Sequence, residues 1–280
     1  MSAPQVKGWC PSAIRPMMSG DGLVVRVKPA LGHLSRAQVL GLCDLAHTSG
    51  SGLIDVTSRA NLQLRGVREH SAALQGLYDL GLLDPNPDAD AQIMCMTTPF
   101  WTTGDLSTRL IQNLRATLHQ LPDLPAKMGI ALDTGPGAVL QDVSADWRFE
   151  LSASGRLILR ADGAPRGFEV SEATAMDRLA EFIAWFCDTG GRAAGRMHRH
   201  LRITPLPPHF QTTPPRPQSD LPRPGDGTYA VPFGSTQAQD LADLMDQSQA
   251  SGLRITPWRM IMLEDAKPCI HPAFISDPMP

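Results

Sequence analysis

The sequence predicts an α+β fold in which two ferredoxin-like half-domains, related by a pseudo-twofold axis, flank an inserted central α/β domain. Three observations support this prediction: a β-α-β-β-α pattern near the N-terminus, its partial repeat near the C-terminus, and a different α/β pattern between them. The expected units are residues 1–88 for the first half-domain, 89–204 for the central domain, 205–227 for a proline-rich linker and 228–280 for the second half-domain.

The first half-domain begins with an apolar strand at 23–27, which follows a Gly-Asp-Gly turn. Ser35 is a good N-cap residue, and apolar side chains recur after it at helical spacing until the Ser/Gly cluster at 49–52. The unit then continues with the strands 53–57 and 61–65 and the helix 71–80.

The middle segment has the pattern of an α/β domain, because short apolar strands alternate with longer amphipathic stretches. Its expected elements are strands at 92–96 and 127–132, helices at 108–120 and 172–187, and a hairpin of 147–151 with 157–160.

The C-terminal segment repeats the beginning of the chain, because residues 35–53 and 235–253 align without a gap. Each copy starts at a serine, which is expected to cap a helix, and ends in Ser-Gly-Leu. Residues 205–227, just before the repeat, hold eight of the 25 prolines. Proline fixes φ and lacks an N–H group, so this stretch is expected to be a semi-rigid linker or an extended strap.

Composition excludes several functional classes. A hydrophobic content of 42%, a charged content of 19% and a net charge of −3 are typical of a globular protein and argue against a dedicated nucleic-acid binder. The five cysteines lack CxxC spacing, which excludes a zinc ribbon and a complete local iron–sulfur ligand set, and no metal ligand is assigned. The sequence has neither a signal-peptide core nor a membrane-length apolar run, so we expect a cytoplasmic protein with no membrane or nucleic-acid partner.

The most specific local motif lies at 57–65, where polar and apolar residues alternate. On a strand, Arg59, Asn61, Gln63 and Arg65 would share one face. Two guanidinium and two amide groups on one face suit a polycarboxylate or an oxyanion. The alternative is a solvated strand face whose arginines pair with surface acids.

Arg26 is a second candidate, because it lies inside an apolar strand. A charge there is costly unless it is paired or faces solvent. The sequence contains no GxGxxG, P-loop or GxSxG motif, so nothing indicates nucleotide binding or a serine hydrolase.

Several strings resemble the nitrite/sulfite reductase superfamily, and within it they are most similar to precorrin-3B synthase of aerobic cobalamin biosynthesis. They are residues 10–11, 15–17, 20–27, 57–65 and 253–259. The resemblance implies an oxidoreductase: a monooxygenase that converts precorrin-3A to a hydroxylated γ-lactone with O2 and an electron donor. The alternatives are a siroheme-dependent nitrite or sulfite reductase and a non-catalytic tetrapyrrole-binding module.

The resemblance also implies roles for individual residues. Those placed at the catalytic face are Arg26 and Lys127, and those placed at the tetrapyrrole carboxylates are Thr57, Arg59, Asn61, Gln63, Arg65 and Arg259. This sequence departs from the family at two basic positions, because the second lysine falls on Gly129 and an expected arginine falls near Ala91. A carboxylate-rich corrin precursor is therefore more compatible than sulfite or nitrite.

The family's cofactors are a [4Fe–4S] cluster, with siroheme or mononuclear iron. The cluster is held by a Cys-x5-Cys and Cys-x3-Cys set that this sequence lacks, and Cys269 is an isolated thiol. We therefore expect a fragment, a truncated product, or a subunit whose cluster domain is a separate chain.

Overall fold

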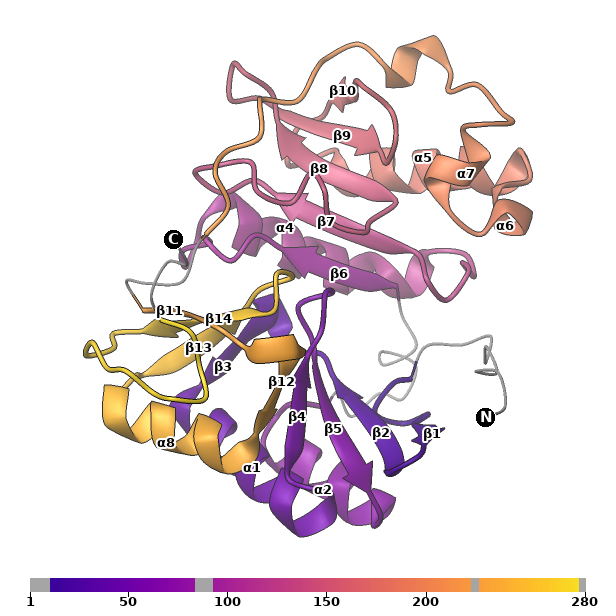
Figure 1. Ribbon diagram of the computed structural model, residues 1–280. Helices are drawn as coiled ribbons and strands as arrows, with labels where there is room; N and C mark the ends of the chain where they lie inside the picture. Colours follow the sequence, from indigo (N-terminus) through magenta and orange to yellow (C-terminus); the bar gives the residue numbers. More distant parts are fainter. Residues whose placement is uncertain (1–10, 84–92, 223–226, 277–280) are drawn as a thin grey trace.

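The computed structural model describes residues 11–83, 93–222 and 227–276. Two mixed layers of strands and helices form one body, and a third sheet with its own helices forms a second body above it (Figure 1). This arrangement confirms the α+β class. The predicted boundary between residues 88 and 89 lies outside the described residues, and the domain limits remain a prediction.

The first sheet has the order β1-β2-β5-β4-β12, and all of its pairs are antiparallel. Its strands are β1 (Met17–Ser19), β2 (Gly22–Val27), β4 (Leu53–Val56), β5 (Leu62–Val67) and β12 (Ser235–Gln237). The last of these comes from the far end of the chain.

The second sheet has the order β11-β14-β13-β3 and is also antiparallel. Its strands are β3 (His33–Ser35), β11 (Thr228–Ala230), β13 (Gly252–Ile255) and β14 (Met260–Glu264). The two half-domains therefore exchange an edge strand, because β3 joins the sheet of the second half and β12 joins the sheet of the first.

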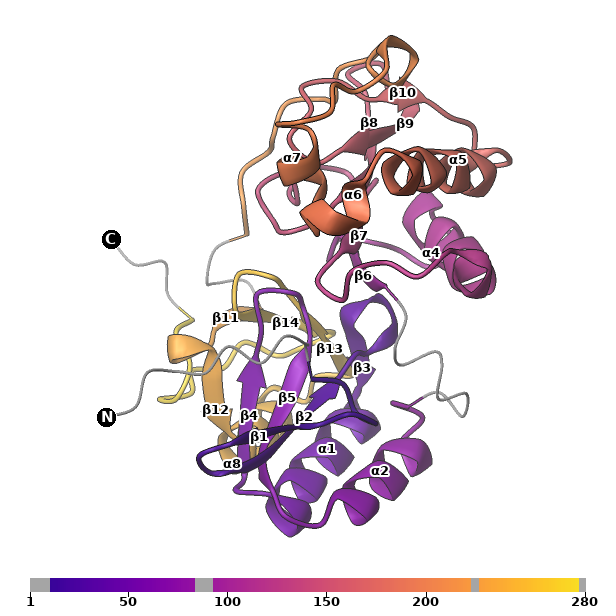
Figure 2. The same cartoon turned by 90° about the vertical axis from the view of Figure 1, so that its right-hand side faces the viewer.

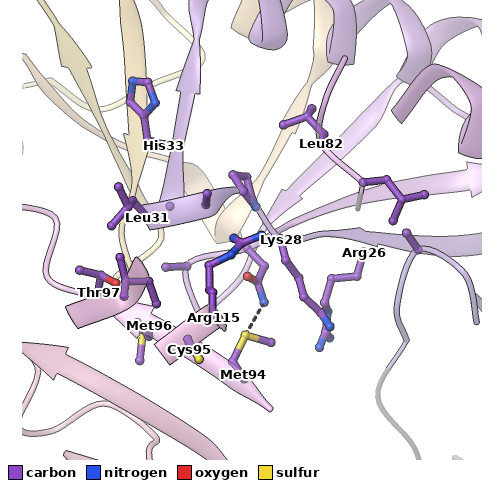
Figure 3. Close-up of a pocket in the computed structure, with 18 of the residues that line it drawn as sticks. Arg26, Lys28, Leu31, His33, Leu82, Met94, Cys95, Met96, Thr97 and Arg115 are labelled. Carbon is purple, nitrogen blue, oxygen red and sulfur yellow. Dashed lines mark hydrogen bonds between the residues drawn. The ribbon is translucent and has the colours of Figure 1, made fainter. Parts of the chain in front are cut away.

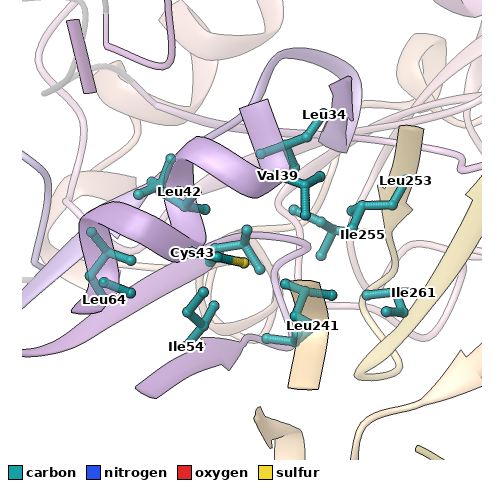
Figure 4. Close-up of a cluster of buried hydrophobic side chains, with 14 of the residues drawn as sticks. Leu34, Val39, Leu42, Cys43, Ile54, Leu64, Leu241, Leu253, Ile255 and Ile261 are labelled. Atoms are coloured by element: carbon teal, nitrogen blue, oxygen red, sulfur yellow. The ribbon is translucent and has the colours of Figure 1, made fainter. Parts of the chain in front are cut away.

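Three helices cover the face of these sheets that lies away from the third sheet (Figures 1 and 2). They are α1 (Arg36–Ser49), α2 (His70–Asp79) and α8 (Ala238–Ser248). Alternate strand residues and the helices form one core across both halves, in which Leu34, Leu42 and Ile54 meet Leu241 and Leu253 (Figure 4). One shared core explains why neither half is a separate globule.

The pseudo-twofold relation extends to the turns that precede the exchanged strands. The short 3-10 turns η1 (Ala30–Gly32) and η4 (Pro232–Gly234) each hold a left-handed non-glycine residue, Leu31 at φ 58° and Phe233 at φ 55°. The glycine that ends each turn approaches the opposite half. A Cβ on Gly32 would lie 3.3 Å from the Ile255 carbonyl oxygen, and one on Gly234 would lie 2.9 Å from that of Val56.

The repeat differs in register from the gapless alignment. Helix α1 is capped by Ser35, whose hydroxyl accepts from the N–H of Gln38, but the N-cap of α8 is Gln237 and makes no side-chain capping bond. The expectation that Ser235 caps a helix is therefore wrong: Ser235 begins strand β12. The physical reason is that α8 has 11 residues and α1 has 14. The difference in residue number between equivalent positions of the two halves therefore changes from the start of the helix to its end.

The third sheet has the order β10-β9-β8-β7-β6, with β6, β7 and β8 parallel and the other pairs antiparallel. Its strands are β6 (Met94–Thr97), β7 (Gly129–Asp133), β8 (Trp147–Leu151), β9 (Leu157–Ala161) and β10 (Phe168–Glu169). Its helices and 3-10 turns are α4 (Leu106–Thr117), η2 (Leu118–Gln120), α5 (Ala175–Asp188), α6 (Gly191–Ala194), α7 (Met197–His200) and η3 (Pro208–Phe210).

After η3, the described part of the proline-rich segment, residues 211–222, runs as an extended strap along the central domain (Figure 1). Thr213 exchanges backbone hydrogen bonds with Gly167, and the Arg216 N–H donates to the Leu151 carbonyl. The guanidinium of Arg216 also donates to the Gly135 and Pro136 carbonyls. The strap is therefore part of the central body over these residues.

Candidate functional site

A pocket of about 940 Å³ opens between the first half-domain and the central domain. Its walls come from the end of β2, from η1, from the chain after α2, and from β6, α4 and η2 (Figure 3). Ligand pockets measure about 300–1,000 Å³ and favour domain interfaces. This pocket therefore has the size and position of a site for a large organic ligand.

Basic side chains gather in the lining of the pocket. The basic groups that line it are Arg26, Lys28, His33, Arg115 and His119, and its described lining contains no Asp or Glu. Between them the wall is apolar and sulfur-rich, formed by Leu31, Leu82, Ile93, Met94, Cys95, Met96, Ile111 and Leu118. Apolar walls with cationic groups suit a ligand that has an extended apolar framework and carboxylates at its edge.

Successive side chains of β2 point to opposite faces of the sheet. Val25 and Val27 are buried facing the helices, so Arg26 between them lies on the other face. Its Nε is buried and has no hydrogen-bond partner among the described residues. Lys28, two residues further along, continues the same face of the chain toward the pocket (Figure 3). An unpaired buried donor costs free energy in the empty protein and is satisfied when an anion binds.

The turn between β4 and β5 brings two predicted residues to the domain boundary. The Thr57 hydroxyl accepts from the N–H groups of Arg59 and Asn61, each at 3.3 Å, so this threonine shapes the turn. The Arg59 Nη2 donates to the Lys127 carbonyl oxygen at 2.9 Å. Arg59 therefore connects the first half-domain directly to the segment before β7.

Asn61 lies in the wall of the pocket and is 3% exposed. Its amide donates to the Sδ of Met94 across the domain boundary, with 3.4 Å between Nδ2 and Sδ (Figure 3). Of the predicted site residues, Arg26 and Asn61 line the pocket itself.

The other predicted residues lie elsewhere. Gln63 is paired with Arg26 in the ladder of β2 and β5 but does not line the pocket. Arg65 pairs with Asp55 at 2.9 Å and with Asp21 at 3.2 Å, as the solvated-face alternative requires. Arg259 lies in the β13–β14 turn, against Gly234 of the second half-domain. The motif therefore does not form one row, because the strand begins only at Leu62.

The sequence did not point to Arg115 and His119, the basic residues that the central domain contributes to the pocket lining. Arg115 and His119 are four residues apart, which places them on one side of a helical segment at the end of α4. The sequence contains both signals: the four-residue spacing of Arg115 and His119 on a helix, and the two-residue spacing of Arg26 and Lys28 on a strand. Their convergence depends on how the two domains meet, which no local pattern reveals.

The described residues do not suit a cluster. They contain no group of three or more His, Cys, Asp or Glu side chains able to hold a metal ion. Burial raises the pKa of the Cys43 and Cys95 thiols to about 12, so both stay protonated at neutral pH. A [4Fe–4S] ligand set is thus not provided by this part of the chain.

None of the described helices has the length and apolar character to cross a bilayer.

Residues 15–74, which contain the exchanged strand, helix α1 and the Arg59 turn, match the family described as the nitrite/sulfite reductase ferredoxin-like half domain. Residues 15–74 are thus similar to a nitrite/sulfite reductase half domain. The resemblance to that superfamily, close to precorrin-3B synthase, is confirmed.

Two relatives place the half domain in a longer context. A curated precorrin-3B synthase from Sinorhizobium sp. is 32% identical over 162 residues, which is 51% of this chain and 32% of the relative. The structure of the Mycobacterium tuberculosis NirA protein superposes with a TM-score of 0.64 at 18% identity, covering 87% of this chain and 54% of that one. The chain thus spans about a third of the length of the curated relative, and the NirA likeness shows a shared fold.

Proposed function

We propose that the chain is the tetrapyrrole-binding part of a precorrin-3B synthase-like oxidoreductase, acting on precorrin-3A in aerobic cobalamin biosynthesis. The observation that carries the proposal is the cationic pocket between the half domain and the central domain, whose described lining holds no carboxylate. The 32% identity to a precorrin-3B synthase supports the choice of substrate.

The chain's own contribution is binding and orientation. Arg26, with its unpaired Nε, and Lys28 attract substrate carboxylates, while the apolar wall contacts the macrocycle. The proposed reaction inserts one atom of O2 into the substrate and reduces the other to water with two electrons from a donor. Because the described residues do not provide a cluster, we assign no step of that electron transfer to this chain.

A conversion assay tests the activity. The chain is mixed with precorrin-3A, a reductant and O2, with and without a cluster-bearing partner, and the product is followed by mass spectrometry. A hydroxylated lactone in either mixture supports the proposal. Absence of product in both mixtures contradicts the proposed activity.

A non-catalytic tetrapyrrole-binding module is the second candidate, favoured by the missing cluster ligands in the described residues. Fluorescence titration with uroporphyrin distinguishes the two candidates. Tight binding without conversion supports the binding module, and no binding at all contradicts both.

A further inference from the structure

Sulfur-containing side chains form the part of the pocket wall that β6 contributes. Met94, Cys95 and Met96 follow one another on this edge strand of the central sheet, and all three line the pocket (Figure 3). Met94 is half-buried, whereas Met96 is 4% exposed. The proposed function assigns no role to these sulfur atoms.

Met94 has a specific partner in the other domain. The Asn61 amide nitrogen Nδ2 donates to the Met94 Sδ over 3.4 Å, from the β4–β5 turn of the half domain to the central domain (Figure 3). Asn61 is 3% exposed, so its amide is shielded from bulk water. A thioether sulfur is a weak acceptor, and a buried donor with a weak acceptor keeps part of its desolvation cost. A stronger acceptor on Met94 would therefore stabilise the contact between the two domains.

Oxidation of the thioether supplies such an acceptor. A sulfur lone pair attacks one oxygen of hydrogen peroxide and the O–O bond breaks. The leaving hydroxide takes the proton of the transferred oxygen and departs as water. Sulfur loses two electrons, the peroxide gains them, and the product is a sulfoxide, whose oxygen accepts hydrogen bonds better than the thioether sulfur does.

The neighbouring sulfur atoms are protected from this reaction. Burial raises the pKa of the Cys95 thiol to about 12, and its Sγ donates to the Ile93 carbonyl oxygen at 3.6 Å. Peroxides attack the thiolate form of cysteine, which is scarce at neutral pH, whereas a thioether needs no deprotonation. Met96 is shielded by its burial. Met94 is therefore the sulfur of this wall at which oxidation is expected.

We propose that Met94 is an oxidation site, at which a hydroperoxide forms a sulfoxide whose oxygen accepts the Asn61 hydrogen bond. The modification places a polar oxygen in the apolar wall, strengthens the contact between the half domain and the central domain, and is reversible by methionine sulfoxide reductases. Hydrogen peroxide forms when O2 is reduced without oxidation of a substrate. Added peroxide serves equally well, so the inference does not depend on the proposed function.

Peptide mass spectrometry after brief treatment of the protein with hydrogen peroxide locates the site. The sulfoxide should form at Met94 at least about tenfold faster than at Met96, because only the first of these thioethers is open to the pocket. Met18 is 59% exposed and gives the rate for an open surface. Equal rates at Met94 and Met96 overturn the proposed site.

Substitutions of the two methionines test the role of Asn61. Glutamine carries its oxygen on the atom that takes the place of Sδ, whereas leucine keeps the wall apolar. Met94→Gln should therefore unfold at a higher urea concentration than Met94→Leu, because it offers Asn61 an oxygen acceptor. At Met96, which packs among buried apolar side chains, the order should be the reverse. A lower urea midpoint in Met94→Gln than in Met94→Leu overturns the role of Asn61.

The oxidised protein gives a second measurement of the same hydrogen bond. Asn61→Leu removes the donor, so peroxide treatment should lower its urea midpoint more than it lowers that of the parent. Equal shifts in the two proteins overturn the hydrogen bond between the sulfoxide and Asn61.

Discussion

Arg148 lies in the protein interior and Arg26 is half-buried at the pocket, and the two arginines differ in their partners. Arg148 is 1% exposed and donates to Asp162 and to the carbonyls of Leu140 and Val143. Arg26 has a buried Nε with no partner among the described residues. A fully partnered arginine supports the fold, whereas an unpartnered one at a pocket is available to a ligand.

We therefore expect Arg26→Met to leave the free energy of unfolding unchanged or to raise it by up to about 1 kcal/mol, because an unsatisfied donor is removed. The same variant should bind uroporphyrin at least about tenfold more weakly, since it loses a charge-assisted hydrogen bond. Urea denaturation and fluorescence titration measure the two effects.

Arg148→Met is the matched control. It should cost about 3–5 kcal/mol, because it removes a buried guanidinium from the half-buried Asp162 and leaves two carbonyl groups without their donor. A comparable loss in Arg26→Met would show that Arg26 is structural.

At the scale of elements, helices α1 and α8 are equivalent but begin differently. The Ser35 side chain and the Gln38 side chain each bond the other's backbone N–H in a capping box, with distances of 3.3 and 3.0 Å. Gln237, at the same place before α8, caps nothing with its side chain. One half of the molecule thus uses a stabilising device that the other lacks.

Opposite substitutions test this difference. Ser35→Ala should lower the free energy of unfolding by about 1 kcal/mol, and Gln237→Ser should raise it by about 0.5–1 kcal/mol. Chemical denaturation monitored by circular dichroism measures both. If Gln237→Ser destabilises the protein, the exposed glutamine has a role that capping does not describe.

The sequence predicted long elements well and short ones poorly. Helix α1 was predicted because Ser35 and the spacing of Val39, Leu42 and Ala46 agree, and this prediction is confirmed. The exchanged strands β3 and β12 have three residues each, too few for a period-2 pattern to show. Their pairing is decided by the packing of the whole molecule.

At the scale of the molecule, a cluster of side chains forms a joint between the first half-domain, the central domain and the second half-domain. The Arg254 guanidinium donates to Glu264, to the carbonyls of Pro99 and Trp101, and lies 3.9 Å from the Trp101 ring centroid. Glu264 also pairs with His33 at 2.8 Å. This joint, like the pocket, could not be predicted from any single segment, because its members come from three units.

The joint should make stability depend on pH. Burial raises the pKa of Glu264, but hydrogen bonds from Arg254 and His33 outweigh it and hold the pKa below 4.5. A depressed folded pKa gives stability that is present above the unfolded value and lost as the pH falls through the folded one. The parent should therefore lose stability below about pH 4.5 more steeply than Glu264→Gln.

Thermal unfolding between pH 3 and 6 measures that slope. Glu181→Gln is the control, because Glu181 forms an exposed pair with Arg178 within one helix. Identical slopes in the parent and Glu264→Gln would show that Glu264 is not the group responsible.

The exchanged edge strands also set an order for folding during synthesis. Strand β4 receives its neighbour β12 only after residue 237 has left the ribosome, some 180 residues after β4 itself has emerged. Until then the N-terminal sheet has an open edge, which can pair with other chains. A nascent chain of this protein must therefore protect that edge, and any product that ends before β12 should aggregate even though its own helices and strands are intact.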